Sequence, residues 1–182
     1  MYFDMYGPFE VARVGGSVLA RQTQMWAAVR KGCAHFGYEE TELERAIGCY
    51  AFGLKVAEND LRPWYIGMTT CDRGFRGEVF QKHKRDHYDT VLRTRRGEPV
   101  MFLMPLLTPE GRFSRDRGTA KPLIQWVEKM LFGVALRVNP HCRNQRDTKF
   151  LREVQVRGVF NHGTRGPPGP AVTAARRMFG TE

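Results

Sequence analysis

Two tyrosines, each close to a glycine, stand in neighbouring apolar runs of this sequence. Tyr50 ends a GCY triplet in the run Cys49–Val56, and Tyr65 begins a YIG triplet in the run Trp64–Thr69. The polar stretch at residues 58–60 separates the runs and predicts a β-hairpin with a loop of several residues. Because side chains alternate along a strand, any register in which paired residue numbers add to an odd total puts both phenols on one face.

Two phenols on one surface can orient or activate a water molecule. A phenol with its ordinary pKa of about 10 is a weak base at neutral pH, so a cation must stabilise the phenolate or the phenol must act by orienting water. Arg73 and Arg76 follow the second run closely enough to supply that cation. A guanidinium also binds phosphate and stabilises the charge that develops during phosphodiester hydrolysis. The pattern therefore favours chemistry on a phosphodiester.

A carboxylate suited to a metal ion stands on the clearest helix of the sequence, Ala120–Val138. Apolar residues recur there at i, i+3, i+4 and i+7, which predicts an amphipathic helix packed on a sheet. Glu128 lies at the margin of the apolar stripe, and one carboxylate with several waters suffices to hold Mg²⁺. The stripe consists of Leu123, Ile124, Val127, Met130, Leu131, Val134, Ala135 and Val138.

Taken in order, these features resemble the GIY-YIG nuclease superfamily: a first tyrosine triplet, the YIG triplet, a following arginine, and a glutamate on a later helix. The resemblance covers roughly residues 47–145, and its sharpest element is the WYIGMT run. It implies that Tyr50 and Tyr65 act on water and that Glu128 holds one Mg²⁺ or Mn²⁺ ion. By spacing, Arg76 matches the arginine that binds the scissile phosphate best, and Arg73 matches it second.

The resemblance also implies roles for residues farther along the chain. His83 and Tyr88 are assigned as proton carriers or phosphate ligands, and Asn144 as the asparagine that helps to hold the site. Asn139 is the second choice for that asparagine and fits a helix C-cap equally well. The chain departs from the family pattern in the cysteine of its first triplet, in the long gap between the tyrosines, and in Phe80, which stands where a histidine is expected.

Positive charge is concentrated after the first tyrosine. Residues 1–60 contain 6 Lys/Arg and 8 Asp/Glu, whereas residues 61–182 contain 23 and 11, within a net charge of +10. This balance favours a polyanionic partner, because each neutralised phosphate releases condensed counterions. We expect DNA, with RNA left open, and we expect Arg73, Lys82, Lys84 and Arg85 to contact phosphates. The arginine-bearing stretch Thr108–Gly118 fits either a phosphate contact or a solvated loop.

Composition predicts a soluble, cytoplasmic protein with no membrane partner. The chain has 182 residues, is 42% hydrophobic, and contains no apolar run of membrane-spanning length. Its opening residues lack the basic start and apolar centre of a signal peptide. Four cysteines without metal-site spacing fit free thiols in a reducing compartment. We expect a monomer or a homodimer, since one such site cuts one strand.

The elements that must position these residues predict an α/β (α+β) fold with a small, mainly antiparallel three-stranded sheet flanked by helices. The third strand is Val100–Met104, and Pro105 suits a sheet edge or the strand's end. The first 46 residues read as an N-terminal extension with helices, one through residues 24–30 and one at Glu42–Ile47. Thr41 and Glu44 fit a capping box for the second of these helices.

Three segments are predicted along the chain. Residues 1–46 form the extension, residues 47–160 the GIY-YIG-like catalytic domain, and residues 161–182 a Gly/Pro-rich arm with a short helix over residues 171–179. A strand or extended segment is expected within residues 150–160. The function predicted is a metal-dependent endonuclease that hydrolyses DNA phosphodiesters. The alternative is a catalytically silent nucleic-acid-binding module on the same scaffold.

Overall fold

The two tyrosine-bearing runs form one long β-hairpin. In the computed structural model, which describes residues 2–35, 39, 41–143 and 169–179, β5 (Gly48–Ala57) pairs antiparallel with β6 (Asp60–Thr69). Only residues 58 and 59 separate the strands, so the predicted loop of several residues is wrong. Both strands continue beyond the apolar runs through two register shifts. One of these shifts accommodates Pro63, which has no amide hydrogen to donate.

The sheet is wider than the three strands predicted. β7 (Glu98–Leu107) pairs antiparallel with the other edge of β5, which makes β5 an interior strand. On its far side β7 pairs with β1 (Tyr2–Phe3) and β2 (Tyr6–Glu10), so five strands are joined within the described residues. The predicted antiparallel character is confirmed, and the count of three is wrong because the N-terminal stretch extends the sheet.

Pro105 lies inside β7 rather than at its end. The strand runs on to Leu107, and Pro105 pairs with Gly48 of β5. On the other side of β7, Phe3 pairs with Leu106 and Tyr6 with Leu103, so Pro105 faces the gap between β1 and β2. A residue without an amide hydrogen is tolerated at that gap because no strand there requires its donation.

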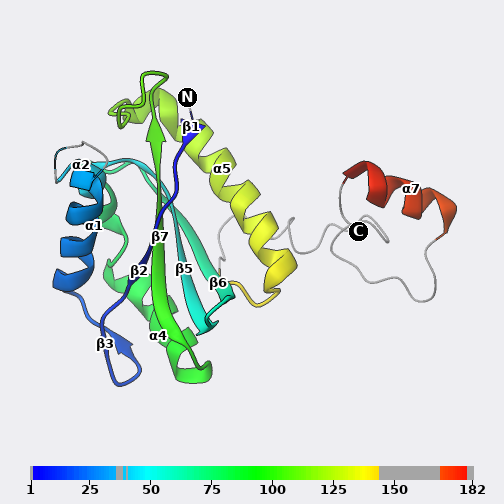
Figure 1. Cartoon of the computed structure of the whole chain (residues 1–182), viewed down its shortest axis with the longest axis horizontal. Coiled ribbons are helices and arrows are strands. Elements are labelled where there is room, and N and C mark those ends of the chain that lie inside the picture. The colour runs from blue at the N-terminus through cyan, green and yellow to red at the C-terminus, as the bar shows by residue number, and fades with distance from the viewer. Residues whose placement is uncertain (1, 36–38, 40, 144–168, 180–182) are drawn as a thin grey trace. The chain divides into compact units, whose positions relative to one another are not determined.

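Helices cover both faces of the sheet (Figure 1). On one face lie α1 (Thr23–His35), α2 (Glu42–Arg45), α3 (Gly74–Glu78) and α4 (Lys82–Thr94), and on the other lies α5 (Arg117–Val138). A second, two-stranded sheet consists of β3 (Arg13–Val14) and β4 (Ser17–Val18). None of the helices that the structure describes combines the length and apolar character needed to cross a membrane.

The core consists of two apolar clusters, one on each face of the sheet. Tyr50 and Phe52 belong to the cluster under α1 to α4, whereas Ile47 and Cys49 belong to the cluster under α5. This division follows from the alternation of side chains along β5. Neighbouring residues of the first tyrosine triplet therefore face different helices.

Helix α5 starts three residues earlier than predicted, and only part of its predicted apolar stripe packs on the sheet. Asp116 is its N-cap and accepts a hydrogen bond of 3.2 Å from the Thr119 amide. Met130, Val134 and Val138, which the apolar pattern predicted to face the sheet, are exposed. The apolar positions span a wider arc than the sheet covers, and the covered side is centred on the following residues: Ile124, Phe132, Ala135 and Leu136.

The N-terminal stretch is not a separate extension. Residues Met1–Asn144 form one compact unit, because β1 and β2 join the central sheet and α1 packs on it. Helix α2 ends at Arg45, and Thr41 makes no side-chain cap, so the predicted capping box is wrong. In the second unit, Gln145–Glu182, the structure describes α7 (Pro170–Phe179), which agrees with the predicted short helix. The strand expected within residues 150–160 lies outside the described residues.

Candidate functional site

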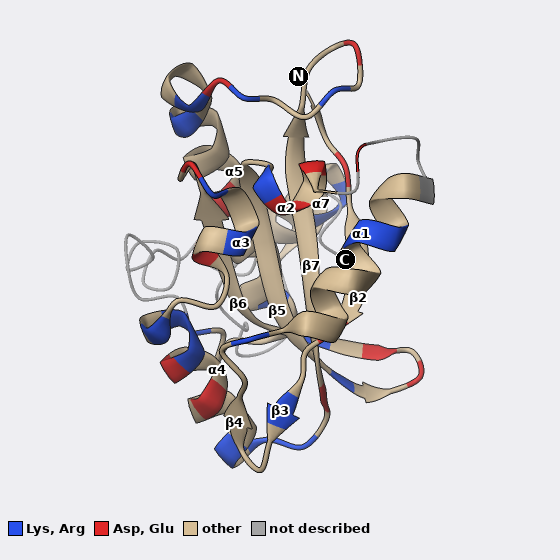
Figure 2. Ribbon diagram, turned by 90° about the vertical axis from the view of Figure 1, so that its left-hand side faces the viewer, with Lys and Arg blue, Asp and Glu red and all other residues tan. Residues whose placement is uncertain are grey.

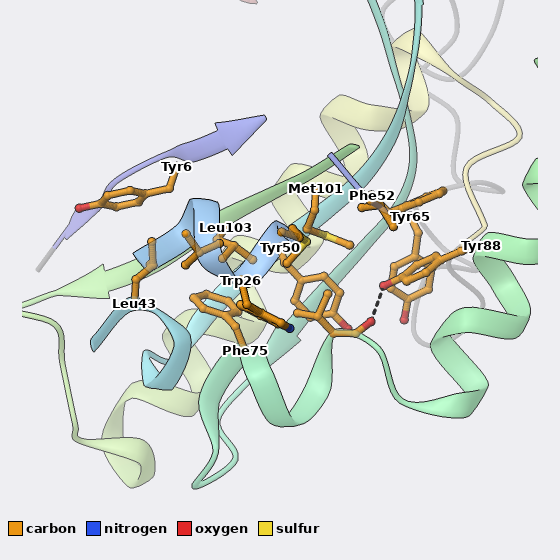
Figure 3. Close-up of a cluster of buried hydrophobic side chains, with 14 of the residues drawn as sticks. Tyr6, Trp26, Leu43, Tyr50, Phe52, Tyr65, Phe75, Tyr88, Met101 and Leu103 are labelled. Atoms are coloured by element: carbon orange, nitrogen blue, oxygen red, sulfur yellow. Dashed lines mark hydrogen bonds between the residues drawn. The ribbon is translucent and has the colours of Figure 1, made fainter. Parts of the chain in front are cut away.

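The two phenols of the tyrosine triplets lie together. Tyr50 pairs with Gly67 and Phe52 with Tyr65, so paired residue numbers add to an odd total. The rings of Tyr50 and Tyr65 are stacked with centroids 6.3 Å apart and an interplanar angle of 26° (Figure 3). The prediction that both phenols share one face of the sheet is confirmed.

Gly67 is the residue that makes room for this pair. The Tyr50 ring lies across the backbone of Gly67, and a Cβ added at that position would come within 2.5 Å of the Tyr50 Oη. Any larger residue would displace the ring or the strand. Glycine is therefore required in the YIG triplet on steric grounds, because the tyrosine of the first triplet occupies the space of a side chain.

The two phenols differ in their access to solvent. Tyr50 is 0% exposed, and burial, followed by the nearby Tyr88 and Tyr65 phenols, holds its pKa well above the usual value of 10. Tyr65 is 8% exposed. Of the pair, Tyr50 stays neutral and packs the core, and Tyr65 is the phenol with a solvent-facing edge.

Tyr65 is surrounded by titratable side chains of α3 and α4. We call Tyr65 and these neighbours the phenol–lysine cluster: Tyr65, Glu78, Lys84 and His87. Lys84 Nζ donates a 2.9 Å hydrogen bond to Tyr65 Oη and lies 3.5 Å from Glu78 Oε1. Burial lowers the pKa of Lys84, but the phenol and the carboxylate outweigh it and the net shift is upward. Lys84 is therefore an ammonium held directly against the phenol oxygen.

His87 forms the other wall of this cluster. Its ring stacks on Tyr65 with centroids 5.5 Å apart and an interplanar angle of 22°. Burial, then the cations Arg143, Lys84 and His83, lower the pKa of His87 below its ordinary 6.5. A neutral imidazole beside the phenol can accept or relay a proton.

Tyr88, predicted to carry protons or bind phosphate, lies in the core. Its ring stacks on Phe52 at 4.3 Å, and its hydroxyl donates a 3.0 Å hydrogen bond to the Val79 carbonyl (Figure 3). Burial raises its pKa well above 10. In this structure Tyr88 positions α4 against the sheet.

The cations predicted to contact phosphates lie on the same side of the molecule, on α4 and at the start of α3. Lys82, His83 and Arg73 are exposed, and Figure 2 shows the basic start of α4 on the side covered by α1 to α4. Arg85 is half-buried, and its Nε donates to the Phe80 carbonyl at 3.2 Å. Unlike the others, Lys84 is engaged with Tyr65.

Arg76 is paired with a carboxylate rather than with either phenol. Its NH1 atom lies 2.5 Å from Oε2 of Glu44, a buried residue of α2. The structure therefore does not place Arg76 beside the tyrosines. Sequence reasoning missed this partner, because the position of Glu44 three residues after Thr41 was interpreted as a capping box.

Glu128 stands on α5, the helix that packs on the other face of the sheet from the phenols. It stands on α5 one turn from both Ile124 and Phe132, and it is half-buried. Burial and then the charge of Glu128 raise the pKa of Cys49, whose thiol is on the α5 face. The charge of Glu128 is also among those that raise the pKa of Tyr50, after burial and the Tyr88, Tyr65 and Glu78 side chains, so this carboxylate acts electrostatically on residues of both faces.

Of the two candidate asparagines, the structure describes only Asn139. Asn144 lies outside the described residues. Asn139 is the C-cap of α5, and its Nδ2 donates a 2.8 Å hydrogen bond to the Pro63 carbonyl of β6. The interpretation of Asn139 as a helix cap is confirmed.

The described residues thus offer a phenol–ammonium pair without a shared metal centre. Within those residues, no three His, Cys, Asp or Glu side chains lie close enough together to hold one ion. Glu78, which was not predicted, is the carboxylate nearest to the phenol–lysine contact, at 3.5 Å from Lys84. Its only signal in the sequence was a spacing of six residues before Lys84 across a helix break.

Comparison with known proteins returned nothing similar: no protein-family model, no curated protein sequence and no solved structure matches this chain.

Proposed function

We propose that this chain binds nucleic acid and hydrolyses its phosphodiester bonds, with Tyr65 as the reacting phenol. The observation that supports this most directly is the 2.9 Å contact between Lys84 Nζ and Tyr65 Oη. An ammonium at that distance stabilises negative charge on the phenol oxygen, which is the condition for a phenol to act as a base near neutral pH. DNA is the substrate that the family resemblance implies.

Each member of the phenol–lysine cluster has a role in this proposal. The Tyr65 phenolate, which Lys84 stabilises, takes a proton from the attacking water and becomes the neutral phenol. Glu78 holds the ammonium from its other side, and His87, neutral at physiological pH, accepts a proton from Tyr65 or returns one to it. Tyr50 keeps the Tyr65 ring in place by stacking.

Exposed cations would bind the substrate's phosphates. Lys82 and His83 begin α4 and Arg73 is the N-cap of α3, on the sheet face that carries Tyr65, and all three side chains are exposed. Their contribution is electrostatic, so affinity is expected to fall steeply as salt rises.

Magnesium or manganese belongs to the proposal through the family resemblance alone. A carboxylate with waters is chemically suited to Mg²⁺, and Glu128, whose charge acts on Tyr50, is the residue that would hold the ion. The roles given above to Tyr65, Lys84, Glu78 and His87 require no ion.

A second candidate is a nucleic-acid-binding module without turnover. The complete burial of Tyr50 and Tyr88 favours it. Both candidates predict binding, and only the first predicts strand cleavage.

Nicking of supercoiled plasmid in Mg²⁺ or Mn²⁺ tests the proposal. Tyr65→Phe and Lys84→Met should each lower the nicking rate at least about a hundredfold, the usual loss when a general base or its activating partner is removed. The matched controls are Tyr2→Phe and Lys129→Met, at exposed positions on β1 and α5, and both should stay within about twofold of the parent.

Three results would contradict parts of this reading. Unchanged nicking by Tyr65→Phe removes the phenol from the mechanism. Salt-sensitive binding without nicking by the parent selects the silent module. Loss of nicking on chelation with EDTA shows that an ion is required, and Glu128→Ala then decides whether that residue holds it.

A further inference from the structure

Three charged side chains from α1, α2 and α3 meet away from the phenol–lysine cluster. Arg30 Nε lies 3.4 Å from Glu44 Oε1, and Arg76 NH1 lies 2.5 Å from Glu44 Oε2. One carboxylate therefore contacts two guanidinium groups from different helices. We call Arg30, Glu44 and Arg76 the arginine pair site.

The burial of the three side chains is uneven. The Glu44 side chain is 4% exposed, whereas those of Arg30 and Arg76 are 32% and 52% exposed. A buried carboxylate needs a compensating cation, and one guanidinium is sufficient for that. The second guanidinium leaves the site with a net positive charge that reaches solvent.

Each guanidinium retains hydrogen-bond donors beyond those directed at Glu44. A guanidinium has five N–H donors in a planar fork that matches the oxygens of a phosphate. Two such groups held by one carboxylate are oriented before any ligand arrives, which reduces the entropy lost on binding.

The surrounding residues hold Arg76 and Arg30 in position. The Arg76 Cζ lies 5.8 Å from the ring centroid of Trp26, and Trp26 stands one turn before Arg30 on α1. Gly74, with φ +56°, lets α3 approach the end of α2, where any Cβ would overlap the Arg45 and Ala46 backbone. Where the two helices approach, the Phe75 amide donates a 3.2 Å hydrogen bond to the Ala46 carbonyl.

We propose that Arg30 and Arg76 form one clamp for a phosphate group of the nucleic acid, with Glu44 as the positioning residue that orients both. The clamp gives the α1–α2 segment a direct part in substrate binding. It rests on the proposed function only in requiring that the chain binds nucleic acid, and it is independent of cleavage.

Duplex DNA binding measured by fluorescence anisotropy over a range of salt concentrations tests the clamp. Arg30→Gln and Arg76→Gln should each weaken binding and reduce the slope of log K against log salt by about 0.9, the value for one phosphate contact. Because both arginines hold one phosphate, the double variant should reduce the slope by less than the two single reductions together.

Glu44→Gln separates a clamp from a general basic surface. It removes a negative charge, so a non-specific field predicts tighter binding, whereas the clamp predicts several-fold weaker binding and a smaller salt slope because both guanidiniums lose their orientation. The matched control is Glu42→Gln on the same helix. The Glu42 carboxylate lies 3.7 Å from the guanidinium of Arg115, a highly exposed side chain. That control should bind slightly more tightly than the parent.

The outcomes are distinguishable from failure of the proposed function. Binding by the parent, with Glu44→Gln tightened to the level of Glu42→Gln, overturns the clamp and leaves nucleic-acid binding intact. No binding by the parent overturns both proposals. If circular dichroism shows that Glu44→Gln is unfolded, the two arginine variants decide, and an unchanged salt slope in both overturns the clamp.

Discussion

At the scale of single residues, the environment separates side chains of the same type. Tyr50, Tyr65 and Tyr88 lie on one face of the sheet, yet only Tyr65 has a cation on its oxygen. Tyr88 donates to a backbone carbonyl, and Tyr50 is fully buried between the rings of Phe75 and Tyr65. The choice of Tyr65 as the reacting group therefore depends on its partner and not on its position in a motif.

His87 should make stability depend on pH. Its pKa is lowered in the folded chain by burial and by the cations Arg143, Lys84 and His83, with Asp86 opposing them. Below the ordinary value of 6.5 the unfolded chain takes up a proton that the folded chain resists, so the free energy of unfolding falls as pH drops through 6.5. Above that pH the residue contributes no pH dependence.

Urea denaturation between about pH 7.5 and 5.5 measures this contribution. His87→Gln should flatten the decline in the free energy of unfolding with falling pH. His141→Gln, at an exposed position whose charge is not among those acting on His87, should leave the decline as it is in the parent. An identical pH profile for His87→Gln and the parent would show that the imidazole is not desolvated.

At the scale of elements, close approach of β5 and β6 depends on the absence of a side chain at Gly67. The Tyr50 ring occupies the space that a Cβ would need. Gly67→Ala should lower the free energy of unfolding by about 1–3 kcal/mol, the usual cost of overpacking a core. Thermal or urea denaturation measures this change.

Gly133 provides the opposite case for comparison. It lies within α5, and a Cβ there would meet nothing within 4 Å. Gly133→Ala should raise the free energy of unfolding by about 0.5–1 kcal/mol, because alanine favours a helix. If Gly67→Ala were as harmless as Gly133→Ala, the Tyr50 ring would not lie over the β6 backbone.

The placement of α5 is also decided between elements. Asn139, at the end of the helix, donates a hydrogen bond to the Pro63 carbonyl. The Arg143 amide donates a 2.7 Å hydrogen bond to the Trp64 carbonyl of the same strand. These contacts seat α5 on the Cys49 face of the hairpin. Helix α5, which carries Glu128, therefore lies on that face.

At the scale of the whole molecule, the first unit contains a complete core. Every residue of the two apolar clusters falls within Met1–Asn144. A chain ending at residue 144 should therefore fold cooperatively, because a domain with its own core can fold alone. Near-ultraviolet circular dichroism and a thermal melt measure this.

A chain that begins at residue 11 is the informative contrast. It lacks β1 and β2, which leaves the outer edge of β7 unpaired and removes Tyr6 from the core, so it should lose the cooperative transition. A cooperative melt for this shorter chain would show that the N-terminal strands are dispensable, and a non-cooperative melt for residues 1–144 would show that the division into two units is wrong.

Much of the fold could be predicted from local patterns. The hairpin and β7 were indicated by apolar runs and α5 by apolar periodicity, and the shared face of Tyr50 and Tyr65 followed from the alternation of side chains. The short strands β1 and β2 could not be predicted, because they depend on an available edge of β7 rather than on their own composition.

The sequence by itself determined which residues alternate onto a common face and where positive charge accumulates, since these depend on neighbours within a few positions. Only the tertiary structure decided which partner each charged group meets: Lys84 at Tyr65 and Glu44 at Arg76. Such pairings join segments distant along the chain, and their geometry is set by how helices seat on the two faces of the sheet. Local periodicity specifies that a helix packs, but not which face receives it.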